Sequence, residues 1–575
     1  MALERPFRSR FLTHEELGAL LHAWQKAHPE LVRLRSIGTS PEGRELWVLE
    51  LGPDPDRVRP AAWVDGNMHA GELAGSSVAL GIAADVLELH LEARGGMRED
   101  HPAKALPPAV RERLRETLFY VMPRVSPDGA EAVLREGRYV RSVPRDRRPH
   151  GPVPRWISSD VDGDGLALTM RVEDPLGDFA AHPTIPGLVV PRALEDEGPF
   201  YKVYPEGMIE HFDGHTVPSP HYLSDNDADL NRNFPWSWMP EPEQIGAGAF
   251  PGSEPESRAI IEWVTARPHV FSWLNLHTFG GVYIRPLGHA PDRKMDPQDL
   301  AVFHQIAEWG EKYGGYPMVS GFEEFTYEPE KPLHGDMADF AYHVRGAIAY
   351  VCEIWDLFAR LGIARKKPFV DHYTRLGREE LERLYRWDAE HNASRIFRPW
   401  KKAVHPQLGD VEIGGLDPRV GIFNPPYELL GEVCDRQSAA YLRVAAMAPA
   451  LRARVVAKRP VGAGATRVDV EVRNEGYLPT YVLSSAKKLA LDARVFVEAR
   501  CDGGASLVSD ARVEIGHLEG WGRGLYRQSI FFLRGEGTTS SRVVSFVVAG
   551  EGRLHVRAHG LRVGATSLEV PVGHP

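Results

Sequence analysis

The sequence predicts an α/β domain followed by a separate all-β sandwich domain. In the first part, short apolar runs at residues 61–65 and 117–122 stand next to helical patterns such as 75–89. That alternation is typical of an open sheet covered by helices. Beyond about residue 449, five alternating or β-branched stretches follow one another with Gly-rich turns between them. This change of pattern predicts a β-sandwich.

The chain has 575 residues, which is too long for one ordinary core. We expect the α/β domain over residues 1–400, with an insertion at 142–224, and the β-sandwich over residues 449–575. Between them, a stretch rich in Pro and Gly predicts a connecting segment at 401–448.

Local patterns predict several elements of the first domain. Residues 13–28 predict an amphipathic helix that Thr13 caps together with Glu16. A polar turn at 38–44 separates two apolar stretches and predicts a β-hairpin. Two further apolar runs, 272–276 and 347–354, predict buried strands, and a charged helix is expected from about residue 379 to about residue 396.

Composition excludes several classes of protein. The formal charge of −11 argues against nucleic acid as a partner, since phosphate binding needs clustered basic charge. We expect no membrane span, because no run approaches the roughly 18–20 apolar residues that one requires. The three cysteines, Cys352, Cys434 and Cys501, form neither a disulfide framework nor a thiolate zinc site. With no apolar signal core at the N-terminus, we expect a cytoplasmic protein.

Four residues carry the strongest chemical signal. His69 and Glu72 lie three apart after a predicted strand, and His277 follows another. Two imidazoles and one carboxylate are a typical three-ligand zinc set that leaves the fourth position for water. Glu353, at the end of the run 347–354, is a candidate general base. Alone, a His-x-x-Glu pair is more often a surface feature. Glu353 alone could form a salt bridge with a core Arg. The presence of all four residues together favours a catalytic site.

A further motif is Asp229-Leu-Asn231-Arg232-Asn233. The planar fork of Arg232 is suited to a carboxylate, and Asp229 could orient a zinc-binding imidazole through its free ring nitrogen. Without the other motifs, the same residues could form a structural turn.

Taken in order, these motifs resemble those of the zinc carboxypeptidases of the carboxypeptidase A-like family. The resemblance covers roughly residues 11–400 and includes 38–44, His69-Ala-Gly-Glu72, 123–129, 229–233, 253–257, His277 and Glu353. It implies a mixed-sheet catalytic domain with one Zn²⁺ bound by His69, Glu72 and His277. It also implies that Glu353 activates the zinc water and then protonates the leaving amine.

The resemblance also implies contacts with substrate. Asn231 and Arg232 are expected to hold the terminal carboxylate of a peptide, Arg141 to stabilise the oxyanion, and Arg138 to make a weaker carboxylate contact. Arg145, Arg147 and Arg148 crowd the same stretch, so the alignment of Arg141 leaves an alternative open.

Three positions depart from the family pattern. Gly71 stands between the two zinc ligands, where the family often has an Arg. Lys331 stands where the family has a mobile substrate-binding Tyr, and Tyr327 is the nearest candidate. The specificity position is Ala338, which is neither acidic nor large and apolar, so strong selectivity for Lys or Arg is not expected.

The insertion contains an acidic loop, Asp160-Val-Asp162-Gly-Asp164-Gly165, that resembles a calcium-binding loop. The pattern is incomplete, because Arg171 stands at the twelfth position, where an EF-hand needs a bidentate Glu. Both Ca²⁺ binding and a solvated acidic turn therefore stay open. From its position in the chain, we expect the insertion to lie over the cleft.

These observations predict a metallocarboxypeptidase that acts on peptides with a free C-terminal carboxylate. The same zinc chemistry on γ-glutamyl or cell-wall peptides, or on acyl-amino acids, is an alternative that uses the same Arg anchor. A non-catalytic peptide-binding protein is a third possibility, and the presence of all three ligands and the base argues against it. The oligomeric state cannot be deduced from the sequence.

Overall fold

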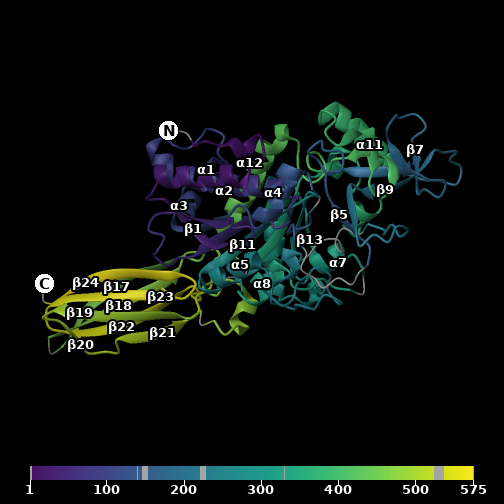
Figure 1. Ribbon diagram of the computed structural model, residues 1–575. Coiled ribbons are helices and arrows are strands. Elements are labelled where there is room, and N and C mark those ends of the chain that lie inside the picture. Colours follow the sequence, from purple (N-terminus) through teal and green to yellow (C-terminus); the bar gives the residue numbers. More distant parts are fainter. Residues whose placement is uncertain are drawn as a thin grey trace.

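The computed structural model describes residues 3–138, 140–145, 153–220, 228–328, 331–462, 464–491, 493–522 and 537–573. Its centre is a mixed eight-stranded sheet in the order β1-β2-β4-β3-β11-β14-β12-β13 (Figure 1). The strands are β1 Val32–Thr39, β2 Glu45–Leu51, β3 Ala61–Gly66, β4 Leu118–Met122, β11 Val270–Thr278, β12 Val282–Arg285, β13 Met318–Ser320 and β14 Ile348–Ile354.

Helices cover both faces of this sheet. The helices of the domain are α1 His14–Ala27, α2 Leu73–Leu91, α3 Pro108–Glu116, α4 Pro127–Glu136, α5 Pro255–Thr265, α6 Pro297–Trp309, α7 Gly321–Phe325, α8 Met337–His343, α9 Leu357–Arg360, α10 Asp371–Thr374, α11 Arg378–His391 and α12 Tyr427–Ala445. Of these, α11 contacts the insertion strand β8 Val189–Pro191. Side chains alternate between the faces: on β3, Ala62 and Val64 pack in the core with α1, α2 and α12, whereas Ala61 and Trp63 pack with α5 and α8.

The local sequence predictions for this domain are confirmed. Helix α1 begins after Thr13, and the reciprocal hydrogen bonds of a capping box join Thr13 and Glu16. Strands β1 and β2 pair as an antiparallel hairpin. The predicted buried strands are β3, β4, β11 and β14, and the charged helix is α11, which ends at His391.

The segment expected to connect the domains is instead part of the α/β domain. Residues 401–448 contain the end of β15 Phe397–His405, all of β16 Gly409–Leu416 and helix α12. Helix α12 packs along α2, and its Tyr441 hydroxyl donates a 2.9 Å hydrogen bond to the Trp63 carbonyl in β3. The Pro- and Gly-rich composition reflects the turns around a hairpin and does not mark a linker.

Most described strands of the insertion extend a second sheet at one end of the domain. This six-stranded sheet runs β15-β16-β6-β9-β7-β8, so the hairpin 397–416 pairs with strands from the insertion. The insertion strands are β5 Arg155–Ser158, β6 Thr169–Glu173, β7 Phe179–Ala181, β8 Val189–Pro191, β9 Phe200–Pro205 and β10 Gly207–Glu210, of which β5 and β10 pair with each other.

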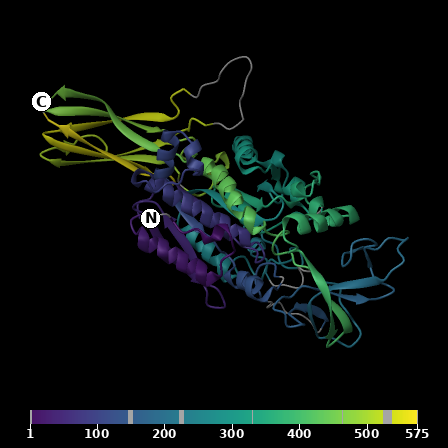
Figure 2. The same ribbon diagram turned by 90° about the horizontal axis from the view of Figure 1, so that it is seen from above.

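The C-terminal domain is a β-sandwich, as predicted, at the opposite end of the molecule (Figure 2). One sheet has the order β17-β18-β22-β20 and the other β21-β19-β23-β24. The strands are β17 Leu451–Gly462, β18 Ala465–Asn474, β19 Val495–Gly503, β20 Ser506–Leu507, β21 Arg512–Gly516, β22 Ser541–Ala549, β23 Gly552–Gly560 and β24 Gly564–Val572. Buried Arg562 donates a hydrogen bond to the Arg345 carbonyl and so joins the two domains.

One stretch, Leu73–Arg94, is long and apolar enough to cross a membrane by length and composition alone. The expectation that no run approaches this length was therefore wrong. In the fold, however, α2 is buried almost entirely between the sheet and neighbouring helices, as expected of a core helix.

Helix α2 lies unusually close to the sheet because two glycines face each other. A Cβ atom on Gly75 would lie 2.8 Å from the Asn67 nitrogen and 2.9 Å from the Leu276 oxygen, both backbone atoms. We therefore expect Gly75→Ala to lower the free energy of unfolding by about 1–3 kcal/mol, as overpacking does.

Denaturant unfolding would measure this loss, with Gly18→Ala in α1 as the matched control. A Cβ atom at Gly18 meets only an ordinary 3.5 Å contact, and the substitution is expected to be neutral or slightly stabilising. Equal stability of the two variants would contradict the close packing of α2.

Candidate metal centre and active site

Three parallel strands bring the candidate residues together. Strand β11 lies between β3 and β14, and in its pairing with β14, His277 stands opposite Glu353. The loop after β3 carries His69 and Glu72 to the same edge of the sheet. Asn67 braces this loop, because its amide donates to the carbonyls of His69 and Ala70, at 2.8 and 3.1 Å.

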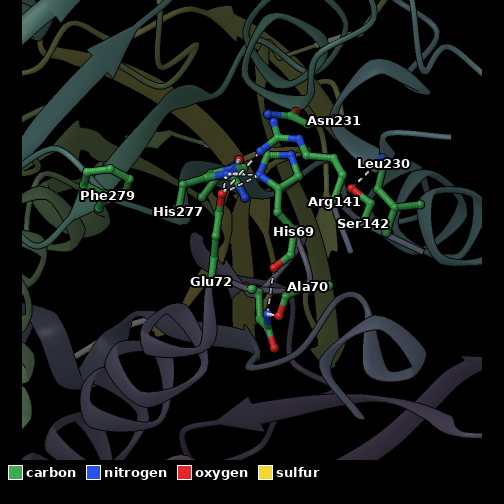
Figure 3. A network of polar contacts seen from close by, with 12 residues as sticks. His69, Ala70, Glu72, Arg141, Ser142, Leu230, Asn231, His277 and Phe279 are labelled. Atoms are coloured by element: carbon green, nitrogen blue, oxygen red, sulfur yellow. Dashed lines mark hydrogen bonds and ion pairs between the residues drawn. The ribbon is translucent and has the colours of Figure 1, made fainter. Parts of the chain in front are cut away.

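The side chains of His69, Glu72 and His277 converge (Figure 3). The His69 Nδ1 atom lies 2.8 Å from Glu72 Oε1 and 3.0 Å from His277 Nδ1, which in turn lies 3.0 Å from Glu72 Oε2. Glu72 Oε2 is buried and makes no well-aligned hydrogen bond. Two ring nitrogens and a carboxylate that face one another at these distances fit a divalent cation as the common partner.

Hydrogen bonds to the Nε2 atoms of both imidazoles determine that the Nδ1 atoms face the centre of the triad. His69 Nε2 lies 3.1 Å from Asp229 Oδ1, and His277 Nε2 faces Asn275 Oδ1 at 2.5 Å. These oxygens accept hydrogen bonds, so each imidazole carries its proton on Nε2 and leaves the Nδ1 lone pair free. The structure thus places Asp229 behind His69, in the orienting position expected from its motif.

Asn275 and Asp65 lie behind His277 in a hydrogen-bonded chain that the sequence reasoning did not single out. The Asn275 amide donates to Asp65, whose other oxygen accepts from the indoles of Trp63 and Trp273 at 2.6 and 2.7 Å. Burial raises the pKa of Asp65 to about 7, although these three donors oppose the shift. The sequence signal for Asn275 is its spacing: it stands two residues before His277 and therefore lies on the same face of β11.

Arg141 lies next to the three metal-facing residues (Figure 3). Its Nε atom donates a 3.0 Å hydrogen bond to Asp229 Oδ2, and one terminal nitrogen lies 3.6 Å from Glu72. Burial alone would raise the pKa of Asp229, but Arg141 and His69 hold it well below its ordinary value. Arg145 instead pairs with Glu254 and Glu256, while Arg147 and Arg148 lie outside the described residues.

Glu353, the predicted general base, stands opposite His277 and lines the cavity. Burial first, and then the charge of Glu72, raise its pKa well above the ordinary value, with Arg141 opposing. The group lines the same cavity as the three metal-facing residues. A carboxyl group with a raised pKa next to a cation site is suited to accepting and returning a proton.

The cavity has a volume of about 570 Å³ and contains most of the predicted site residues. Asn231, Arg232, Tyr327 and Ala338 all line it. Arg138 is not among the residues that line it, and its guanidinium faces Glu136 at 3.2 Å. Its expected contact with substrate stays a prediction.

The cavity walls include aromatic and aliphatic residues that the sequence did not single out. They come mainly from 357–384 and 416–423, and include Phe358, Tyr373, Leu384 and Phe423. None of the described residues of the insertion lines the cavity, so the expectation that it lies over the cleft was wrong for the part that the structure describes.

The acidic loop lies away from this cavity. Oxygens of Asp160, Asp162 and Glu206 approach within 4.8 Å of one another, whereas Asp164 pairs with Lys401 at 2.9 Å. Arg171, at the twelfth position, pairs with Glu412. The described carboxylates of the loop also accept hydrogen bonds from backbone amides. Calcium binding by this loop stays a prediction.

Comparison with known proteins gives matches for both domains. Residues 17–158 and 216–359 match the zinc carboxypeptidase family, and residues 450–571 match a domain of unknown function. Human carboxypeptidase A6 is 32% identical over 129 residues, which are 22% of this chain and 26% of the relative. Mouse carboxypeptidase D is 24% identical over 301 residues, 51% of this chain and 14% of the relative. The chain thus spans about a quarter or less of these relatives.

Similar solved structures include thrombin-activatable fibrinolysis inhibitor and carboxypeptidase A from Helicoverpa armigera. The first has a TM-score of 0.42 at 15% sequence identity and covers 77% of this chain and 78% of that one. The second has a TM-score of 0.41 at 15% identity and covers 76% and 74%.

The contact between Asp229 and His69 generates a test of the metal site. We expect Asp229→Asn to lower the affinity for Zn²⁺ about 10–100-fold, because the amide no longer fixes the His69 ring and its tautomer as a carboxylate does. Competition with a chromogenic chelator measures this affinity.

The matched control is Asp56→Asn, which removes an exposed carboxylate that pairs with Arg33. This control should bind Zn²⁺ as the wild type does. Equal affinity of the Asp229 variant and the control would show that Asp229 does not orient a metal ligand.

Proposed function

We propose, on the premise that this chain belongs to the zinc carboxypeptidase family, that it hydrolyses the C-terminal amide bond of peptides. One observation carries the proposal: the cavity that holds the triad His69, Glu72 and His277 also contains Glu353 and the pair Asn231–Arg232. A cation site, a proton carrier and a carboxylate anchor in one cavity are the groups that this hydrolysis requires.

The donor set fits zinc. His69 and His277 each carry the ring proton on Nε2 and so offer an unprotonated Nδ1 atom. Buried Glu72 adds the carboxylate. Zinc bound by these residues supplies a Lewis acid for the scissile carbonyl and lowers the pKa of a water molecule toward ~7.

The anchor for the substrate is Arg232 with Asn231. Arg232 uses one nitrogen to donate to the Asn231 carbonyl at 2.6 Å and forms no ion pair within the described part of the chain. Its fork can therefore pair with the terminal carboxylate of a peptide. The Asn231 side-chain oxygen accepts from the Met337 amide, which fixes the side chain and directs its NH₂ group as a donor.

Glu353 moves the proton. In its ionised form it accepts a proton from the attacking water, and it then gives that proton to the departing amine. The second cause of its raised pKa is the charge of Glu72, which a bound cation neutralises, so metal binding favours the ionised form. Arg141, held by Asp229, provides a positive charge for the developing oxyanion.

Replacing the proton carrier tests this assignment. We expect Glu353→Gln to bind Zn²⁺ with unchanged stoichiometry and to lose about 10²–10⁴-fold in kcat, because the amide cannot accept a proton. The assay is release of C-terminal amino acids from a mixed peptide panel, with zinc measured by elemental analysis.

A chelator should abolish release by the wild-type protein, and added Zn²⁺ should restore it. Turnover by the Gln variant at the wild-type rate would contradict the role of Glu353. Stoichiometric zinc with release only from isopeptides or acyl-amino acids would instead favour the alternative substrates.

A further inference from the structure

A second group of metal-binding side chains lies apart from the candidate metal centre and shares none of its residues. It consists of His289, Asp339 and His343, and we call it the α8 cluster. One ligand atom from each of the three residues lies within 4.8 Å of the others. His289 Nδ1 lies 2.8 Å from Asp339 Oδ2. Two imidazoles and one carboxylate are again a donor set that suits Zn²⁺.

Two elements that are already held together supply these side chains. Asp339 and His343 are four residues apart on α8 and therefore project from the same face of the helix. His289 belongs to the loop after β12. The Gly288 amide in this loop donates to both oxygens of Asp339, at 3.2 and 3.1 Å, and so fixes the loop against the helix. The three donors are thus positioned by the fold before any ion binds.

His343 has a ring nitrogen that lacks a partner. Its Nε2 atom is buried, and within the described ranges it makes no hydrogen bond. The ring stacks on Trp236, with 4.2 Å between the ring centroids and 14° between the planes, so its orientation is fixed. Burial lowers the pKa of His343 to about 4, which leaves the imidazole neutral near neutral pH, with one lone pair available. A buried polar group in this state is unfavourable unless a ligand pairs with the ring.

The buried group around His101 shows how such a cluster is satisfied without a metal ion. There, Asp85 and Glu88 lie beside His101, but Arg5 and Arg98 pair with both carboxylates. The guanidinium groups take the place that a metal cation would occupy. The α8 cluster has no Arg or Lys partner of this kind within the described part of the chain.

We propose that His289, Asp339 and His343 bind a second zinc ion, which links the loop after β12 to α8. The site goes beyond the proposed function, because the chemistry proposed there uses none of these three residues. On binding, Zn²⁺ replaces the proton between His289 Nδ1 and Asp339, and this proton passes to solvent. The side chain of His289 is 26% exposed, which gives the ion a path from solvent.

Metal content measures the second site. After loading with Zn²⁺ and dialysis against metal-free buffer, the wild type should contain two zinc ions per chain by elemental analysis. His289→Gln and His343→Gln should each retain one. His277→Gln, which lacks a ligand of the first site, should also retain one. The matched control, His304→Gln, removes an exposed imidazole on α6 and should keep two.

The melting temperature of each metal-free variant shows whether it is folded. Because the His289 ring is partly exposed, His289→Gln is expected to melt as the wild type does. Its loss of one zinc ion would then report on binding and not on folding. In the His277→Gln protein, Zn²⁺ should still raise the melting temperature, since the remaining ion binds only the folded chain.

Replacing His289 by Cys gives a positive signal for the same site. Nδ1 is the ring nitrogen nearer to Cβ, so a Cys sulfur at this position can reach the same ion, and thiolate is a good zinc ligand. With Co²⁺ in place of Zn²⁺, His289→Cys should show a sulfur-to-cobalt charge-transfer band. The wild type should lack this band, because neither ligand set contains Cys.

Two further variants make the cobalt signal specific. Adding His343→Gln to His289→Cys should abolish the band, because the α8 cluster then lacks a second ligand. His304→Cys, the matched control on α6, should show no band. An equally strong band in His304→Cys, or a band that persists without His343, would contradict a site built by the α8 cluster.

The zinc counts distinguish the second site from the first. A single zinc ion that is lost in His277→Gln and kept in both Gln variants of the α8 cluster would overturn the inference and leave the first site standing. Two zinc ions in both of these variants would place the extra ion elsewhere and would also overturn it. A single ion that is lost only in the α8 variants would support the inference, and the metal centre of the proposed function would fail instead.

Discussion

The parallel alignment of β3, β11 and β14 is the constraint on which the site depends. Strands in a sheet lie about 4.8 Å apart, so residues that pair across them project side by side. His277 pairs with Glu353 in this way, while β3 ends one strand away and its loop returns His69 and Glu72 to the same edge. The loop can turn this tightly because Gly66 and Gly75 let α2 approach the sheet backbone. Ligand convergence is thus a consequence of strand register and close helix packing.

Electrostatics explains the composition of the site. Glu72, Asp229 and Glu353 crowd a buried region in which Arg141 contacts both Glu72 and Asp229. Such an excess of carboxylates is stable only with further positive charge, which a divalent cation supplies. The same reasoning applies at the other end of the cavity, where Asp336 and Asp339 lie close together. The cavity therefore contains two regions of negative charge, one at the metal-facing residues and one at Asp336 and Asp339.

Local patterns predicted much of the fold and failed in identifiable places. The capping box at Thr13 and the apolar strands were predictable because hydrophobic period and cap chemistry act within a few residues. The hairpin of β15 and β16 was missed because β16 gains its second partner, β6, from the insertion, more than 200 residues earlier in the chain. Arg138 lies beside the acidic Glu136 and outside the cavity lining, a placement that alignment to a family motif does not reveal.

The sequence by itself determined the chemical identity of the centre. His69, Glu72, His277 and Glu353 were recognisable because their residue types and their places at strand ends are local properties. Only the tertiary structure decided the surroundings of these residues: which oxygens hold the outer imidazole nitrogens and which walls enclose the cavity. Those properties depend on contacts between segments far apart in the chain, and they follow from packing and charge compensation, which no local pattern specifies.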